Sequence, residues 1–329
     1  MRMLIAMAAL LTAAISAFIW TSAEDDSVYE ISVLASEEDR LKKIDGVVDG
    51  LHDLGYAEKE YRLNVFQSDP ETTLAEAAEQ SADADPDVIL SLGGVESQEL
   101  AEMLHSRSLQ LPVVFAGMAA PVQTGMIETF EEPQGLFTGI SNHQRTLSAK
   151  RVELFADLIP SMDRIILLYN ENVDISRRSL AAAEKAAEQL EIEVIGFDVG
   201  METDYDALAD IVDADTGVMT LPSYVVESKT EEWVQFSDEL EVPLMGIHEF
   251  EVEAGFLAAY GTSFYEQGLQ AARPLSLILQ GNEPEDIPAE LPDVVTFYKN
   301  DQVFRNWSGE INPDIARFAE SVQSEGEEE

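Results

Sequence analysis

The stretch VILSLGGVESQELAEML, from Val88 to Leu104, decides the fold class. A short apolar run passes through two glycines into a helical pattern, and such runs alternating with helices indicate βαβ units and a parallel sheet. Similar phrases return at Leu111–Val122, Arg164–Leu190 and Gly217–Phe236. The chain is therefore predicted to form two α/β lobes, and ligands of open α/β sheets bind outside the carboxyl ends of the strands.

Charge is the most unusual property of the composition. The 329 residues include 64 acidic and 19 basic side chains, which give a formal net charge of −45, while 46% of the residues are hydrophobic. That length and apolar content suffice for two packed domains. The charge argues against nucleic-acid and anionic-membrane partners and favours adaptation to high salt, where charges are screened, over an ordinary acidic protein.

The N-terminus has the pattern of an export signal. Arg2 precedes an uncharged apolar run from Met3 to Trp20, and acidic residues follow from Glu24. Thr21-Ser22-Ala23 is a candidate cleavage site, although the run is long enough for an uncleaved anchor. The chain has no cysteine, which excludes disulfides, thiolate chemistry and a lipidated cysteine. We expect an exported, periplasmic or extracytoplasmic protein.

The remaining pattern predicts where the chain passes between the lobes. Crossing segments are expected near Ser141, near Gly261-Thr262 and from Gly281 to Pro284, because the strand and helices after Tyr260 are too few for a third domain. The predicted division is residues 1–27 as signal or anchor, 28–141 with 262–283 as lobe 1, 142–261 with 284–318 as lobe 2, and 319–329 as an acidic, disordered tail.

Several segments, in this order and spacing, resemble one family. They are GVVDGLHDLGY (46–56), DPDVILSLGG (85–94), LPVVFAGMAAPVQTGM (111–126), FTGISN (137–142), IILLYNEN (165–172) and VPLMGIHEFEVEAGFLAAYGTSFYEQGLQAA (242–272). The chain thus resembles the substrate-binding proteins of ABC transporters, of the tryptophan/tyrosine type. The resemblance implies two Rossmann-like lobes of the type 1 periplasmic-binding, or Venus flytrap, kind, with three crossovers. It also implies capture of a small molecule between them and delivery to a membrane permease.

The chain departs from the family pattern at two places near the expected cleft. Gly93-Gly94-Val95-Glu96 stands where Gly-Thr and small residues are common, and Ala119-Ala120 precedes Pro121-Val122 where an Asp is frequent. Both departures bear on the ligand, which in this family is often an aromatic amino acid.

Candidate ligand-binding residues follow the predicted strands. Backbone amides at 93–97 could hold an anion, Glu96 an ammonium group or hydroxyls, and the tyrosines a stacking face. The alternatives are a tight turn, a solvated surface acid, an N-cap at Ser223 and hinge packing at Tyr260. The full set is Ser36, Glu37, Gly94, Val95, Glu96, Ser97, Met118, Tyr169, Asn170, Ser223, Tyr224, Glu249 and Tyr260.

No known catalytic motif occurs in the sequence. It has no GxSxG, GxGxxG, GxxxxGK[ST] or HExxH motif, and His52, His105, His143 and His248 lack metal-ligand spacing. We therefore expect no catalytic residue, metal or cofactor, and a monomeric solute-binding protein of an ABC importer that closes around its ligand. A ligand-sensing module for a signalling partner, and a secreted α/β enzyme, remain as alternatives.

Overall fold

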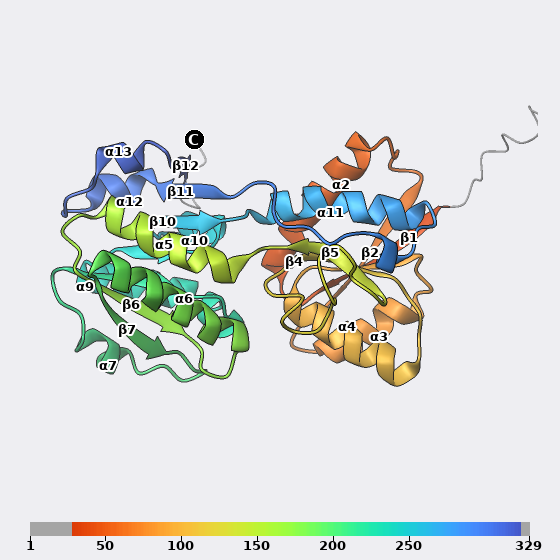
Figure 1. Ribbon diagram of the computed structural model, residues 1–329, viewed down its shortest axis with the longest axis horizontal. Coiled ribbons are helices and arrows are strands. Elements are labelled where there is room, and N and C mark those ends of the chain that lie inside the picture. The colour runs from red at the N-terminus through yellow and green to blue at the C-terminus, as the bar shows by residue number, and fades with distance from the viewer. Residues whose placement is uncertain (1–27, 324–329) are drawn as a thin grey trace, which may run out of the picture.

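The computed structural model describes residues 28–323 as two α/β lobes side by side (Figure 1). The predicted signal segment lies outside the described residues. Lobe 1 is built on an all-parallel sheet of five strands in the order β2-β1-β3-β4-β5. Lobe 2 is built on a seven-stranded sheet in the order β12-β11-β10-β9-β8-β6-β7. The predicted fold of two parallel-sheet lobes is confirmed.

The elements of lobe 1 come from both ends of the described chain. The strands are β1 (Tyr29–Ala35), β2 (Tyr61–Gln67), β3 (Val88–Ser91), β4 (Val113–Met118) and β5 (Phe137–Ser141). The helices are η1 (Glu38–Leu41), α2 (Lys42–Asp53), α3 (Leu74–Asp83), α4 (Gly94–Arg107), α11 (Phe264–Leu279) and η2 (Pro284–Asp286).

Lobe 2 adds an antiparallel edge to a parallel sheet. Its strands are β6 (Arg164–Tyr169), β7 (Glu193–Asp198), β8 (Thr216–Thr220), β9 (Leu244–Gly246), β10 (Ala258–Gly261), β11 (Thr296–Asn300) and β12 (Glu320–Val322), with β11 antiparallel to β10. Its helices are α5 (Gln144–Leu158), α6 (Asp174–Leu190), α7 (Tyr205–Ala209), α8 (Tyr224–Glu227), α9 (Thr230–Leu240), α10 (Glu249–Ala254), α12 (Asp301–Asn306) and α13 (Pro313–Ala316).

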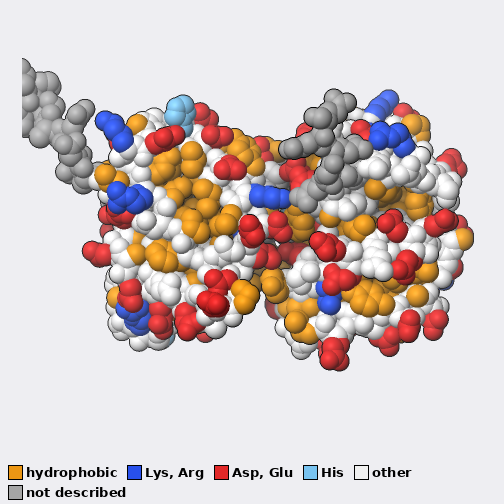
Figure 2. All heavy atoms as spheres, turned by 180° about the vertical axis from the view of Figure 1, so that it is seen from behind, with side chains coloured by type: hydrophobic (Ala, Val, Ile, Leu, Met, Phe, Trp, Pro, Cys, Tyr) orange, Lys and Arg blue, Asp and Glu red, His pale blue; other side chains and the backbone are white. Residues whose placement is uncertain are grey.

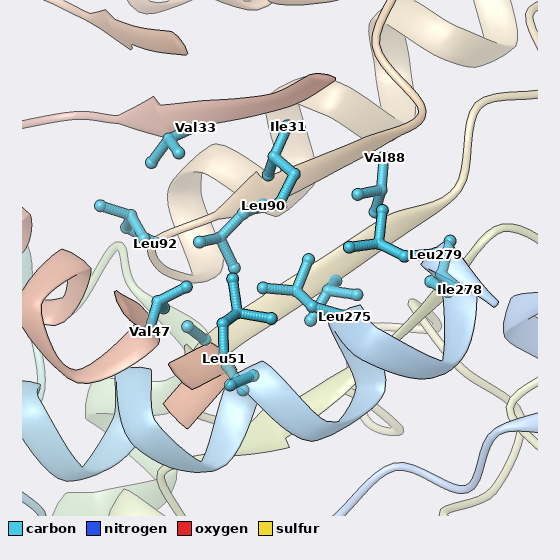
Figure 3. Packing of buried hydrophobic residues seen from close by; sticks show 14 of the residues in the cluster. Ile31, Val33, Val47, Leu51, Val88, Leu90, Leu92, Leu275, Ile278 and Leu279 are labelled. Atoms are coloured by element: carbon cyan, nitrogen blue, oxygen red, sulfur yellow. The ribbon is translucent and has the colours of Figure 1, made fainter. Parts of the chain in front are cut away.

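Both faces of each sheet are buried, which explains why the strands read as continuous apolar runs. On one face of the lobe 1 sheet, Val33 and Leu90 pack against Leu51 of α2 and Leu275 of α11 (Figure 3). On the other face, Phe115 and its neighbours pack against α3 and α4. Lobe 2 repeats this arrangement with two core clusters of its own.

Helices α2 and α11 lie side by side although more than two hundred residues separate them (Figure 1). Their approach requires glycine. A Cβ atom on Gly46 would lie 2.0 Å from the Tyr265 carbonyl oxygen, and one on Gly268 would lie 1.9 Å from the Lys43 carbonyl oxygen. This contact fixes the position of α2, whose first turn faces the other lobe.

The chain passes between the lobes after β5, after β10 and before β11. Thr138 Oγ1 donates to the Ile287 carbonyl at 2.7 Å, and the Ser141 amide donates to the Glu290 carbonyl at 2.8 Å. Residues 284–290, which the sequence analysis assigned to lobe 2, therefore lie against β5 of lobe 1.

The acidic tail expected from residue 319 begins with an ordered strand. Tyr298 pairs with Glu320 and Asn300 with Val322, so β12 extends the sheet of lobe 2. Backbone pairing at this edge is independent of side-chain charge, which is why composition alone did not reveal it. Between residues 28 and 323, no helix has the length and apolar character needed to cross a membrane.

Candidate functional site

A cavity of about 440 Å³ lies between the lobes, in the size range of small-molecule sites. It is bounded by the start of α4, the loop after β4, the segment leading into α5 and the starts of α6, α8 and α11. These are strand ends and helix N-termini, as the topology of open α/β sheets predicts. Figure 2 shows the constriction between the lobes from behind, with acidic side chains gathered around it.

Several buried polar atoms on the cavity residues have no hydrogen-bond partner. They are Asn142 Oδ1, Gln144 Nε2, Ser223 Oγ, His248 Nδ1 and Gln267 Oε1. Buried polar groups are nearly always paired, and leaving one unpaired costs about 1–3 kcal/mol. Residues from both lobes that line one cavity thus carry donors and acceptors without partners, the pattern expected of a site whose ligand supplies the missing partners.

The wall from lobe 1 carries a buried ion-pair network. Arg40 Nε lies 3.0 Å from Glu37 Oε1 and 3.4 Å from Glu96 Oε1. Glu96 is fully buried and also accepts from the Ser36 amide at 2.9 Å and the Ser36 hydroxyl at 2.7 Å. Burial opposes its ionisation, but Arg40 and these hydrogen bonds together hold the pKa of Glu96 below its ordinary value.

Lys43 stands beside this network on the first turn of α2. Its side chain is fully buried, and Nζ donates to the carbonyl oxygens of Leu92 at 2.6 Å and Ala116 at 2.7 Å. Nζ also lies 4.9 Å from the centre of the Phe264 ring. The amine thus ties together the ends of β3 and β4 at the cavity, and burial lowers its pKa well below the ordinary value.

The wall from lobe 2 holds its buried carboxylate by a different means. Glu251 Oε2 accepts from the amides of Ile247 at 2.5 Å and His248 at 2.7 Å, and Oε1 accepts from the Thr220 hydroxyl at 3.0 Å. No cation lies within ion-pair distance of it among the described residues. Burial raises the pKa of Glu251, and it also raises that of Glu227, which lines the cavity.

A third buried cation secures the crossing segments. Arg151 on α5 donates from Nε to the Tyr260 carbonyl at 2.6 Å and from Nη1 to the Ser148 hydroxyl at 3.3 Å, and it contacts Gln144 Oε1. Burial lowers the pKa of Arg151 to about 10. Because Gln144 lines the cavity and Tyr260 lies near the end of β10, this side chain links the cavity to two of the crossings.

The structure places part of the predicted site on the cavity. Gly94, Val95, Met118, Ser223 and Tyr224 line it. All five lie at a strand end or at the first residues of the helix that follows, where the strand-end argument had located them.

Four further predicted residues lie directly behind the lobe 1 wall. Ser36, Glu37 and Glu96 belong to the Arg40 network and do not line the cavity. Ser97 is fully buried and donates to the Gly93 carbonyl at 2.7 Å, so it stabilises the start of α4.

The other four predicted residues lie away from the cavity. The Asn170 amide donates to the Val199 carbonyl at 2.7 Å and its oxygen accepts from the Asn172 amide, while Tyr169 packs on the core of lobe 2. Tyr260 also packs on that core, and Glu249 lines a smaller cavity of about 170 Å³ nearby. From the second lobe, Asn172–Ile175 line the main cavity, whereas the sequence predicted Tyr169 and Asn170 at this position.

Most of the other residues that line the cavity were not predicted from the sequence, among them Arg40, Lys43, Asn142, Gln144 and Gln267. Asn142 directly follows β5, so the rule that ligands bind at strand ends applies to it. The sequence was interpreted there only as a crossing between the lobes near Ser141. Lys43 and Gln267 lie on helices, and only the packing of α2 against α11 brings them to the cavity. Across residues 28–323, no group of three or more His, Asp or Glu side chains is arranged to hold a metal ion.

Comparisons with known proteins agree with this architecture. The family described as ABC transporter substrate binding protein matches residues 29–323. A tyrosine-binding protein of Clostridioides difficile is 23% identical over 272 residues, covering 81% of this chain and 76% of that protein.

Two solved structures show the same fold. An ABC domain from Streptococcus pneumoniae in complex with L-Trp has a TM-score of 0.79 and 21% identity, covering 90% of this chain and all of that one. A conserved domain protein from Vibrio cholerae has the same TM-score and identity, covering 91% of this chain and all of that one. With a family match over nearly all described residues, the chain belongs to the family of ABC transporter substrate binding proteins.

Proposed function

We propose that this protein captures an amino acid, or a close amino-acid analogue, in the cavity between its lobes and delivers it to the permease of an ABC importer. The observation that carries the proposal is the set of unpaired buried polar atoms on residues of both lobes that line this cavity. The L-Trp complex and the tyrosine-binding protein among its relatives support the ligand class. The protein acts by binding and without chemistry.

Capture by hinge closure follows from the division into lobes. The crossings after β5, after β10 and before β11 would form the hinge, because they are the segments that join the two lobes. Lys42 of lobe 1 already lies 3.3 Å from Glu253 of lobe 2, which supports such an approach. A ligand that contacts both walls favours the closed arrangement by its differential affinity.

The N-terminal pattern and the net charge support a cellular location and working conditions for this function. The export signal supports a site of action outside the cytoplasm, free or held by an uncleaved N-terminal anchor. The net charge of −45 supports work at high salt, and we propose a monomer that meets its permease through the two lobes together.

Calorimetric titration at high salt tests the proposal. The full chain is titrated with L-tryptophan, L-tyrosine, other amino acids, sugars and purine compounds, and we expect one-to-one binding confined to amino acids. Binding of a sugar or a purine instead would overturn the proposed ligand class.

A matched pair of serine variants locates the binding. Ser223→Ala removes an unpaired hydroxyl from the cavity, and we expect about a twofold to tenfold loss of affinity, the value of one hydrogen bond, with unchanged stability. Ser228→Ala removes a hydroxyl at the other end of α8, where it donates to the Val225 carbonyl outside the cavity. Equal effects of the two substitutions would place the ligand elsewhere.

A further inference from the structure

Lys43 combines two properties that rarely occur together. Its side chain is fully buried, yet none of the ion pairs found among residues 28–323 gives it a carboxylate partner. Its two hydrogen bonds go to neutral carbonyls, those of Leu92 and Ala116. Burying an ammonium group without a counter-ion is unfavourable, so Lys43 lacks the partner that its charged form requires.

The neighbouring cation, Arg40, does have carboxylate partners. Arg40 lines the same cavity but is already neutralised by Glu37 and Glu96. The chain has 64 acidic residues and only 19 basic ones, so a shortage of acidic side chains does not explain why Lys43 has no carboxylate partner. Lys43 is thus a cavity-lining cation for which the described residues supply no ion-pair partner.

The two cavity walls also differ in charge. Arg40 and Lys43 lie on the wall from lobe 1, together with the start of α4, whose helix dipole favours negative charge. On the wall from lobe 2, Glu227 is the acidic residue without an ion-pair partner among the described residues, whereas Asp174 is paired with Arg177 and Arg178. A zwitterionic ligand fits this arrangement in one direction, with its anionic group on lobe 1 and its cationic group on lobe 2.

We propose that Lys43 is a specificity-determining residue that receives the anionic group of the ligand, the carboxylate in the case of an amino acid. The proposal rests on the proposed function and deepens it. When the carboxylate binds, it supplies the missing counter-ion, and the charged form of the amine becomes favourable. A ligand without an anionic group leaves the amine unpaired and is rejected.

Charged groups on several elements around Lys43 also shift the pKa of its amine. Arg40, from the turn before α2, disfavours the ammonium form, while Glu96 on α4, Glu227 on α8 and Glu37 before η1 favour it. His248, the residue before α10, lines the same cavity, and burial lowers its pKa well below the ordinary value. The dominant influence on Lys43 is burial itself, which a bound carboxylate would oppose.

The first test compares ligands that differ by one charged group. Wild type is titrated with L-tryptophan, with tryptamine, which lacks the carboxylate, and with indole-3-propionate, which lacks the amine. In Lys43→Met we expect a loss of about thirtyfold or more for the two carboxylate ligands and little change for tryptamine. Lys185→Met, on α6 and outside the cavity, is the control and leaves all three affinities unchanged. Equal losses for all three ligands in Lys43→Met would contradict the assignment.

The second test uses the wild-type chain, so it depends neither on the folding of a variant nor on knowing the ligand. The lysine side-chain ¹³Cε and ¹⁵Nζ signals of the wild-type chain are followed against pH with and without acetate, the smallest carboxylate probe, at fixed salt. We expect Lys43 to titrate far below the other lysines and its midpoint to rise when acetate is added. A Lys43 midpoint that acetate leaves unchanged would overturn the proposal. A raised midpoint in a protein that binds no amino acid would refute the proposed function and leave the anion site standing.

Discussion

The two walls of the cavity stabilise buried carboxylates in opposite ways. On lobe 1, Glu96 is ionised against Arg40 and the hydroxyl and amide of Ser36. On lobe 2, Glu251 accepts two backbone amides and a hydroxyl, without a cation at ion-pair distance among the described residues. The same strand-end topology therefore carries a salt-bridged network on one side and a hydrogen-bonded turn on the other. The difference shows that topology positions a site but does not determine its charge.

The largest effect is expected where the ion pair is broken. Glu96→Ala leaves Arg40 buried without one of its two counter-ions, and removing one partner of a buried pair costs about 3–5 kcal/mol in the free energy of unfolding. Chemical denaturation at fixed salt measures the loss. Glu102→Ala, at an exposed position on the same helix, is the control. A loss at 96 no larger than that at 102 would mean that the network is not stabilising.

A smaller effect is expected from the helix contact that carries Lys43. Gly46→Ala places a methyl group 2.0 Å from the Tyr265 carbonyl oxygen, so α2 must move away from α11 at a cost of about 1–3 kcal/mol. Gly200→Ala in lobe 2, where the added Cβ lies 3.5 Å from its nearest neighbour, serves as control. Thermal unfolding of both variants checks the prediction, and equal melting temperatures would contradict the close contact.

The pH dependence of stability should have opposite signs at the two walls. The pKa of Glu96 is lowered from 4.5, so its contribution is present above about pH 4.5 and is lost as the pH falls through the folded value. The pKa of Glu251 is raised from 4.5, so its contribution is present below that pH and is lost as the pH rises through the folded value.

Glutamine substitutions at both positions test these signs. The stability advantage of wild type over Glu96→Gln should shrink as the pH falls below about 4.5. The stability of wild type relative to Glu251→Gln should instead fall as the pH rises above about 4.5. Urea unfolding across this pH range measures both differences, and slopes of the same sign would refute the comparison.

The smallest effect is expected at the ion pair that spans the two lobes beside the smaller cavity. Glu253→Gln removes the partner of Lys42, and because both side chains are partly exposed the pair contributes about 0.2–1 kcal/mol to closure. The chain has no cysteine, so one introduced cysteine in each lobe allows the interlobe distance to be followed by single-molecule fluorescence. The shift toward open molecules should fade at high salt. Glu231→Gln, exposed on α9, should show no shift.

Much of the fold could be predicted from the sequence because both sheets are buried on two faces. The runs at Val88–Leu90 and Val113–Ala116 are apolar throughout, and they lie in β3 and β4. The course of 284–290 and the strand β12 were missed, since both depend on backbone pairing with distant strands. Such pairing leaves little trace in local composition.

The site could be predicted only where the residues follow a strand. Gly94, Met118 and Ser223 do so and line the cavity. Lys43 and Gln267 reach it from helices that pack together through distant glycines, and no local pattern reveals that contact. Asn170 satisfies the strand-end rule, but its amide is used by the Val199 carbonyl. Which strand-end groups remain unpaired depends on tertiary hydrogen bonds.

Native mass spectrometry of protein purified gently at high salt shows whether the cavity holds an amino acid. We predict one small molecule per chain, identified after release as an amino acid or a close analogue with both a carboxylate and an ammonium group. The variant Ala119→Trp, which fills the cavity, should carry none. A bound molecule without a carboxylate, or one that Ala119→Trp retains in equal amount, would contradict the account.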